Sequence, residues 1–190
     1  MSTAFVSLPR LAAGLVLALL SACKTPPPPV VEVRPAIPVL YSWKGTDLAG
    51  PVAIKIDLSE QKAELTRGGQ PAGWTYVASG TSRHPTPTGS FRIMEKVRDK
   101  HSTSWGKIVS ASGNTLVRDA KNGRDSAAGG RFVGAPMPFW MRIHGSIGMH
   151  AGPIPYPGSP ASHGCIRLPR EMAEILFGVT EIGTPVQVVP

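Results

Sequence analysis

Cysteine is nearly absent from this chain, since only Cys23 and Cys165 occur among its 190 residues. A framework of several disulfides is therefore excluded as the source of stability. Long apolar runs are also missing: residues 11–20 form a stretch too short to span a bilayer as a mature helix.

Aromatic residues make up only 6% of the chain, and the chain has 12 acidic residues against 20 basic ones. The basic residues are scattered and not interleaved with aromatics, which argues against a nucleic-acid partner. The formal charge of +8 fits an acidic cell-wall polymer or anionic lipid head groups, and equally a solvated surface without a partner.

The N-terminus has the pattern of an export signal. Arg10 precedes the apolar stretch, which ends in Leu20-Ser21-Ala22-Cys23. This ending resembles the lipobox of bacterial lipoproteins, in which the cysteine is lipidated and the preceding peptide is removed. We therefore expect residues 1–22 to be a lipoprotein signal peptide and Cys23 to carry the lipid anchor, with an ordinary secretory signal as the alternative. Each buried acyl methylene contributes about 0.8 kcal/mol to membrane binding. Lys24 follows the cysteine, where an aspartate would resemble an inner-membrane retention signal, so we expect a periplasmic protein at the inner face of the outer membrane.

Residues 23–38 form a proline-rich linker after the anchor. Pro26 to Pro29 favour an extended polyproline conformation, which is typical of a semi-rigid spacer, although a motif for a proline-binding partner has the same composition. Residues 39–190 remain as one domain with a core of about 51–190.

The domain is predicted to be mainly β, because short segments with period-2 alternation are separated by glycine and proline. The predicted strands are 52–58, 62–65, 74–79, 91–94, 107–109 and 186–189. One helix is predicted from Pro169 to Phe177, with Glu171 in its first turn and Gly178 at its end. The polar segment 111–131 is long for a structureless loop and is a candidate mobile flap.

Cys165 lies in the run Ser162-His163-Gly164-Cys165-Ile166-Arg167. With Cys23 lipidated, an exported domain keeps one thiol without a partner, which indicates a nucleophile; the alternative is a buried cysteine that acts as a small hydrophobe. A free thiol is mostly protonated at neutral pH, so it needs an imidazole as base. Gly164 permits close approach of the backbone, and the turn offers a backbone N–H to a developing oxyanion.

The same run resembles the signature of the L,D-transpeptidase catalytic domain, also called YkuD-like. Four further segments, at 86–91, 104–106, 148–152 and 183–186, match that family in order and extend the resemblance over about residues 51–190. The resemblance implies a mostly β fold, a sandwich or barrel with one or two short helices, and a cysteine nucleophile at its rim. It also implies peptidoglycan stem peptides as substrate.

Two histidines upstream of Cys165 compete for the role of base. His150 lies in Gly-Met-His-Ala-Gly, and its spacing to Ser162 resembles the shorter-loop members of the family; His144 lies in a His-Gly pair and resembles the longer-loop members. We assign the base to His150. His163 is expected to shape the site and Ser162 to orient a histidine. A zinc site is the rival use of these residues, but no Cys-x-x-Cys or His-x-x-x-His pair accompanies them, so no metal is predicted.

Three further residues are candidates for substrate binding. The planar fork of Arg167 suits a carboxylate of the stem peptide, although an internal salt bridge would use it equally well. Trp140 is a candidate for the wall of a groove, with core packing as the alternative. His144 is the third candidate, with a surface or packing residue as the alternative.

The sequence thus predicts a lipid-anchored peptidoglycan L,D-transpeptidase that needs no cofactor, because a thioester carries the acyl group from one amide to the next. In this reading Cys165 attacks the diaminopimelate carbonyl of a tetrapeptide stem, releases D-alanine and passes the acyl group to an amine. A carboxypeptidase or amidase that uses water at the same site, and a non-catalytic wall-binding lipoprotein, remain as alternatives.

Overall fold

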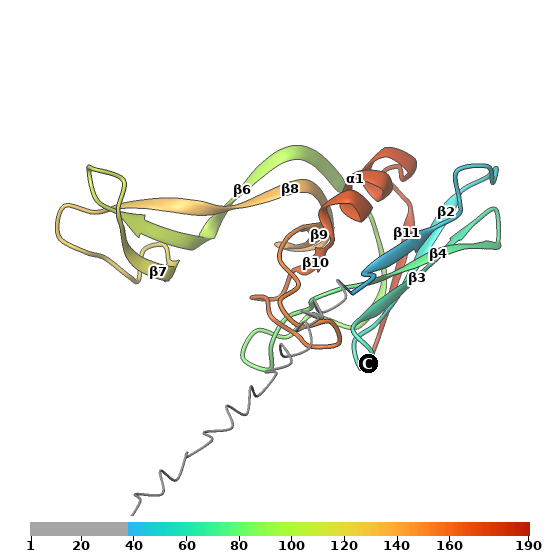
Figure 1. Ribbon diagram of the computed structural model, residues 1–190, viewed down its shortest axis with the longest axis horizontal. Helices are drawn as coiled ribbons and strands as arrows, with labels where there is room; N and C mark the ends of the chain where they lie inside the picture. The colour runs from blue at the N-terminus through green and yellow to red at the C-terminus, as the bar shows by residue number, and fades with distance from the viewer. Residues whose placement is uncertain (1–37) are drawn as a thin grey trace, which may run out of the picture. The chain divides into compact units, whose positions relative to one another are not determined.

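The computed structural model describes residues 38–190 (Figure 1). The signal peptide, Cys23 and all but the last residue of the proline-rich linker lie outside the described residues, so these predictions stay predictions. Within residues 38–190, no helix has the length and apolar character needed to cross a membrane.

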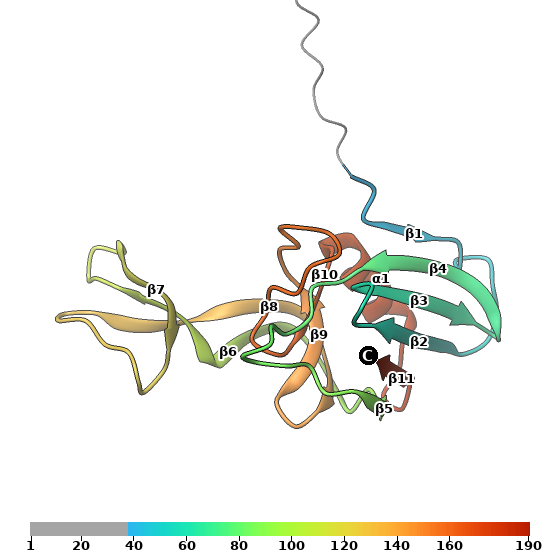
Figure 2. The ribbon, with the colours of Figure 1, turned by 90° about the horizontal axis from the view of Figure 1, so that it is seen from below.

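The first sheet has six strands in the order β1-β4-β3-β2-β11-β5 (Figure 2). Its strands are β1 (Tyr41–Trp43), β2 (Val52–Asp57), β3 (Lys62–Arg67), β4 (Gln70–Tyr76), β5 (Gly89–Arg92) and β11 (Pro185–Val189). All neighbours are antiparallel except β11 and β2, which are parallel. The alternation of β2 explains its position: Val52, Ile54 and Ile56 are buried, while the residues between them are partly or fully exposed.

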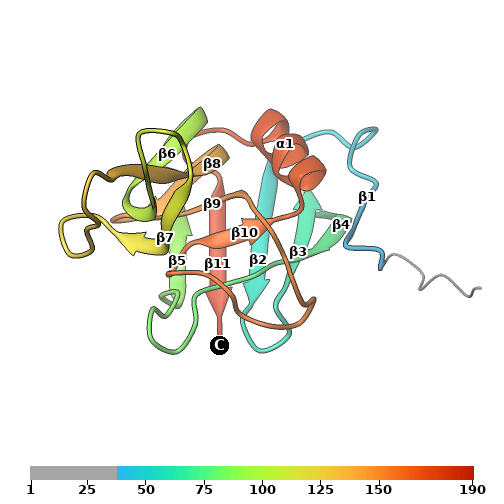
Figure 3. The same ribbon diagram turned by 60° about the vertical axis from the view of Figure 1, so that its left-hand side comes forward.

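The second sheet has five strands in the order β10-β9-β8-β6-β7. They are β6 (Glu95–Val109), β7 (Thr115–Lys121), β8 (Arg131–His144), β9 (Ile147–Ala151) and β10 (Ile166–Leu168). Only β9 and β10 pair in parallel. Figure 3 shows the strands of this sheet running across those of the first.

One hydrophobic core joins the two sheets. It contains Ile54 and Leu65 of the first sheet and Met141, Met149 and Ile166 of the second. Helix α1 (Arg170–Val179) completes it with Met172, Ala173 and Leu176 and packs against β8 and β9. The prediction of a mainly β fold with a short helix is confirmed. Both sheets are open, so the sandwich describes the domain and the closed barrel does not.

The far parts of β6 and β8 extend beyond the core and carry β7, and we call residues 98–134 the arm (Figure 1). The segment 111–131, the candidate mobile flap, contains a strand that the sequence did not indicate, because Thr115–Lys121 pairs with β6; its mobility stays a prediction. The predicted strand 107–109 is only the end of β6. The helix begins one residue after Pro169 and includes Gly178, and its last turn is closed by Thr180, whose N–H and hydroxyl both donate to the carbonyl of Leu176.

Candidate active site

The turn that carries Cys165 directly precedes β10. Gly164 has φ +110°, and a Cβ there would lie 2.8 Å from the Cδ1 of Ile147, so glycine is required. The Ser162 hydroxyl accepts a hydrogen bond from the Gly164 N–H at 3.1 Å and donates one to the carbonyl of Cys165. Ser162 was expected to orient a histidine, but its hydroxyl holds the backbone of the turn.

Hydrogen bonds fasten this turn to the segment that follows β4. The Thr86 hydroxyl donates to the Gly164 carbonyl at 2.7 Å and accepts from the Gly80 N–H at 2.8 Å. The N–H groups of Ala161 and Ser162 both donate to the Ser79 carbonyl at 3.0 Å. The Thr-Pro-Thr-Gly motif that begins at Thr86 therefore has a structural reason, because its first residue is buried against the turn that carries Cys165.

His150 projects from β9, whose register places it opposite Arg167 of β10. Its side chain is only 6% exposed, and burial lowers the pKa of the imidazole from 6.5 to about 4. The Nδ1 atom lies 2.9 Å from the carbonyl oxygen of Ala151. Because a carbonyl only accepts, Nδ1 carries the hydrogen and Nε2 keeps its lone pair. His150 is therefore a neutral imidazole near pH 7 with a free basic nitrogen.

Cys165 is half-buried and its thiol is free. Burial raises the pKa of this thiol, while a hydrogen bond from the Gly148 backbone and the charge of Arg167 act in the opposite direction. The sulfur lies 3.9 Å from the carbonyl oxygen of Ser146, to which the thiol donates. The resting site thus contains a protonated thiol and a neutral imidazole, and the thiolate forms when the proton is taken up by a base.

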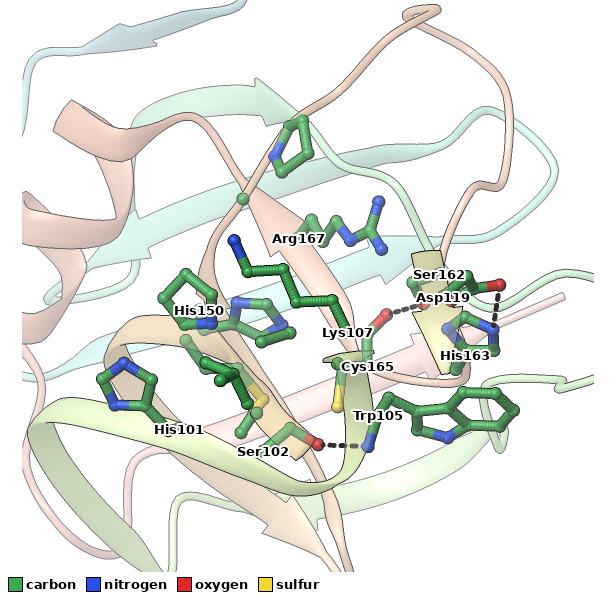
Figure 4. A pocket seen from close by; sticks show the side chains of 18 residues that line it. His101, Ser102, Trp105, Lys107, Asp119, His150, Ser162, His163, Cys165 and Arg167 are labelled. Atoms are coloured by element: carbon green, nitrogen blue, oxygen red, sulfur yellow. Dashed lines mark hydrogen bonds and ion pairs between the residues drawn. The ribbon is translucent and has the colours of Figure 1, made fainter. Parts of the chain in front are cut away.

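Cys165 and His150 line the same cavity, which has a volume of about 600 Å³ (Figure 4). Two cationic side chains, Arg167 and Lys107, also line it. The stem of Arg167 packs on Gly152, where a Cβ would lie 2.9 Å from the arginine Cγ. Within residues 38–190, no carboxylate lies within salt-bridge distance of Arg167, so the internal salt bridge that was its alternative role is not formed there. We call this space the first cavity.

His163, in the turn that carries Cys165, contacts two residues of the arm. Its ring stacks on Trp105 of β6, with centroids 3.7 Å apart and an angle of 14° between the planes. Its Nε2 lies 3.4 Å from the Oδ2 of Asp119 on β7 (Figure 4). Burial lowers the pKa of His163, and the neighbouring carboxylate opposes this shift. His163 lines the first cavity together with Cys165.

A second cavity, of about 460 Å³, adjoins Cys165 and is lined by Trp140, Glu95, Lys100 and Arg142. Trp140 is buried, and its indole N–H donates to Glu95 Oε2 at 2.8 Å. Its ring lies over Gly148, where a Cβ would come within 2.7 Å of it. Trp140 therefore combines both of its expected roles, because it is packed and also borders a cavity.

His144 lies apart from these residues. It ends β8, is exposed, packs its ring 5.3 Å from that of Phe91, and lines neither cavity. No three histidine, cysteine or carboxylate side chains within residues 38–190 gather in a geometry that would hold a metal.

The structure adds residues that the sequence did not indicate: Lys107 and Asp119 of the arm, and Glu95, Lys100 and Arg142 beside Trp140. They come from strands that the alternation pattern missed or truncated. A net charge count along 95–142 would have marked the segment as basic, but not which residues face Cys165.

A free thiol and a neutral imidazole that border one cavity, on a two-sheet β domain, define a cysteine–histidine site of the kind that performs acyl transfer. The family model of the L,D-transpeptidase catalytic domain matches residues 51–188, and the chain belongs to this family. No curated protein gives a match.

Solved L,D-transpeptidases share the fold. One from Mycobacterium smegmatis has a TM-score of 0.56 at 20% identity, with 74% of this chain and 59% of that chain covered. A Cys-to-Ser mutant of the Enterococcus faecium enzyme has a TM-score of 0.55 at 28% identity, with 74% and 50% covered. A third L,D-transpeptidase, solved in complex with imipenem, has a TM-score of 0.54 at 24% identity, with 73% and 58% covered. This chain therefore spans between half and three fifths of the length of these proteins.

Proposed function

We propose that this chain is a peptidoglycan L,D-transpeptidase with Cys165 as its nucleophile. The observation that carries the proposal is the pairing of the Cys165 thiol with the neutral, buried imidazole of His150 at one cavity. The family membership and the solved neighbours support the same activity.

In the first half-reaction, Nε2 of His150 takes the proton of the Cys165 thiol as the sulfur attacks the diaminopimelate carbonyl of a tetrapeptide stem. The new S–C bond forms an oxyanion intermediate, for which we assign the backbone N–H of Cys165 as a donor, because that of Gly164 already bonds to Ser162. The C–N bond to the terminal residue then breaks, and the imidazolium returns its proton to the leaving amine. D-alanine departs and the acyl group remains as a thioester.

In the second half-reaction, an acceptor amine attacks the thioester and gives its proton to His150. The C–S bond breaks, an amide forms, and the proton returns to the sulfur. One amide is exchanged for another, so these steps consume no nucleotide. The donor stem lies in the first cavity, where Arg167 and Lys107 face its carboxylates.

Muropeptide analysis tests this function. The purified full chain, in detergent, is incubated with isolated sacculi, and the digested wall is examined by mass spectrometry. New diaminopimelate–diaminopimelate dimers and released D-alanine are the expected products. Tripeptides without dimers would show that water is the acceptor, and an unchanged wall would leave only a binding role.

Imipenem offers a separate test of the acylation half, because a related L,D-transpeptidase has been solved in complex with it. The full chain is expected to gain the mass of one imipenem at Cys165, and the Cys165→Ala variant none. Labelling of both proteins would refute the assignment of the nucleophile.

The anchor belongs to the same proposal. Lipidation of Cys23 would hold the domain at the periplasmic face of the outer membrane, and the proline-rich linker would let it reach the wall. The sequence pattern at residues 10–29 supports this proposal.

A further inference from the structure

The second cavity has its own charges and a direct route to the nucleophile. Cys165 borders both cavities, with His101, Ser102, Trp105, Met137 and His163 shared along the boundary. A thioester on Cys165 would therefore be open to a ligand held on the second side. The first cavity would remain occupied by the rest of the acyl chain.

Strand register places two charged residues of the second cavity, Glu95 and Arg142, in one row with Cys165. Glu95 of β6 pairs with Arg142 of β8, and Arg142 pairs with Gly148 of β9. Ile166 pairs with Met149, so Cys165 comes beside Gly148. Arg142 is thus two strands from Cys165, or about 10 Å between Cα atoms. An arginine side chain and one amino-acid end together can cover this separation.

The contacts of Arg142 leave its outer end available. Its Nε is buried without a hydrogen-bond partner and lies 3.4 Å from Glu95 Oε2. The side chain is 37% exposed, and no salt bridge or hydrogen bond within residues 38–190 uses its two terminal nitrogens. Glu95 therefore lies beside the Nε atom of Arg142, and the terminal nitrogens of this lining residue are left without a partner among the described residues.

The charge of this group suits a single carboxylate. Glu95 also lies 3.8 Å from Lys100, whose ammonium is 5.8 Å from the centroid of Trp140. One carboxylate and two cations leave a net charge of +1. The hydrogen bond from Trp140 and the charges of Lys100 and Arg142 lower the pKa of Glu95, so it stays ionised near neutral pH and keeps this balance.

We propose that the second cavity is the acceptor subsite and that Arg142, assisted by Lys100, binds the carboxylate of an amine that carries that carboxylate on the same carbon. This inference rests on the proposed transpeptidase function. The chemistry is that of an amino-acid end, which occurs both at the distal centre of a diaminopimelate stem and in a free D-amino acid. The fork fixes the carboxylate, and the adjacent amine is directed along the row toward the thioester. The positive charge nearby also favours the unprotonated, nucleophilic amine. A lysine side chain of a protein lacks this carboxylate and is disfavoured.

Two matched pairs of acceptors test the proposal on the purified full chain, with a disaccharide tetrapeptide as donor. The first pair is D-methionine and its decarboxylated amine, 3-methylthiopropylamine. The second is a diaminopimelate tripeptide stem with a free or an amidated carboxyl at its distal centre. Mass spectrometry measures released D-alanine, the acyl-enzyme, and the transferred and hydrolysed products. In at least one pair, the carboxylate-bearing acceptor is expected to be transferred roughly tenfold more, the usual scale for one lost charged hydrogen-bond pair. The pair that shows this preference tells whether the acceptor is a diaminopimelate stem or a free D-amino acid.

Variants test whether Arg142 causes the preference for acceptors that carry a carboxylate. Arg142→Gln is expected to lose the preference and to yield more hydrolysed tripeptide, while the rate of acyl-enzyme formation stays within about twofold. Arg142→Lys keeps the charge without the fork and should retain part of the preference. Arg131→Gln, on the same strand but outside both cavities, is the matched control and should behave as the unchanged chain.

Equal transfer to both members of both pairs by the unchanged chain would overturn the proposal, and this result does not depend on any variant folding. A preference that persists in Arg142→Gln would overturn the role of that residue. Absence of acyl-enzyme and of D-alanine release in the unchanged chain would instead refute the proposed function, and this inference with it.

Discussion

Acidification should destabilise this domain through His150. The imidazole has a pKa of about 4 in the fold against 6.5 as its ordinary value. Between these pH values the unfolded chain binds more protons than the folded chain, so stability falls as the pH falls. The contribution of the neutral His150 imidazole to the free energy of unfolding is complete above pH 6.5 and is lost as the pH falls to 4. A difference of this size corresponds to about 3 kcal/mol in total, of which about 2 kcal/mol is lost by pH 5.

Urea unfolding between pH 7 and pH 4.5, followed by tryptophan fluorescence, measures this loss. Carboxylates titrate in the same range, so the informative quantity is the difference between the unchanged chain and His150→Asn, which has no titrating ring. The variant is expected to lose less stability on acidification, by about 2 kcal/mol at pH 5, whatever its stability at pH 7. His144→Asn, which removes an exposed ring, is the control and should keep the slope of the unchanged chain. If the free energies of unfolding of the unchanged chain and of His150→Asn fall equally with pH, His150 is not a neutral, buried imidazole.

Replacing Cys165 by Ala or Ser should abolish turnover while the domain stays folded, because a hydroxyl is far less acidic than a thiol; activity in either variant would contradict the mechanism, and unfolding of both would indicate a packing role. His150→Ala should suppress iodoacetamide labelling of that thiol at neutral pH, with recovery toward high pH, and lower turnover by about 10²–10⁴, whereas His144→Ala should leave the labelling profile nearly unchanged. Gly148→Ala should reduce activity, since the added methyl group displaces the indole packed over it; near-normal muropeptide yields would contradict that packing. Cys23→Ser should move the active domain from the membrane fraction to the soluble fraction, and firm membrane binding without the lipid would refute the anchor.

Clean alternation made part of the fold predictable. Val52–Asp57 has buried residues at every second position, as a strand with one face on the core requires. Strand β8 was missed because Pro136 and Pro138 interrupt its sequence, a pattern that argues against a regular strand. Phe139 has φ +58°, and three consecutive residues from there are buried, which breaks the period of two. Such irregular pairing depends on the partner strands and cannot be inferred from one segment.

Some residues of the site could likewise be predicted from the sequence, and others could not. Cys165 and the residues of its turn could be identified because they are adjacent in sequence and chemically distinctive. The spacing also favoured His150, and this residue lines the same cavity as Cys165. Arg142 and Glu95 are ordinary charged residues in the sequence, and they acquire a shared position with Cys165 only through the register of four strands. A register of this kind is a property of the assembled sheet.

The position of β11 has a consequence for the order in which this domain forms. The strand closest to the C-terminus lies inside the first sheet, between β2 and β5, and supplies Val186 and Val188 to the core. A chain shortened before Pro185 would leave two separated sheet edges and an open core, so the domain cannot reach its final packing until these residues have been synthesised. Pairing of β11 with β2 joins segments about 130 residues apart, the kind of distant contact that slows folding. If residues 1–22 act as the export signal that we propose, this delay would be useful, because a translocated polypeptide must stay unfolded until its last strand has crossed.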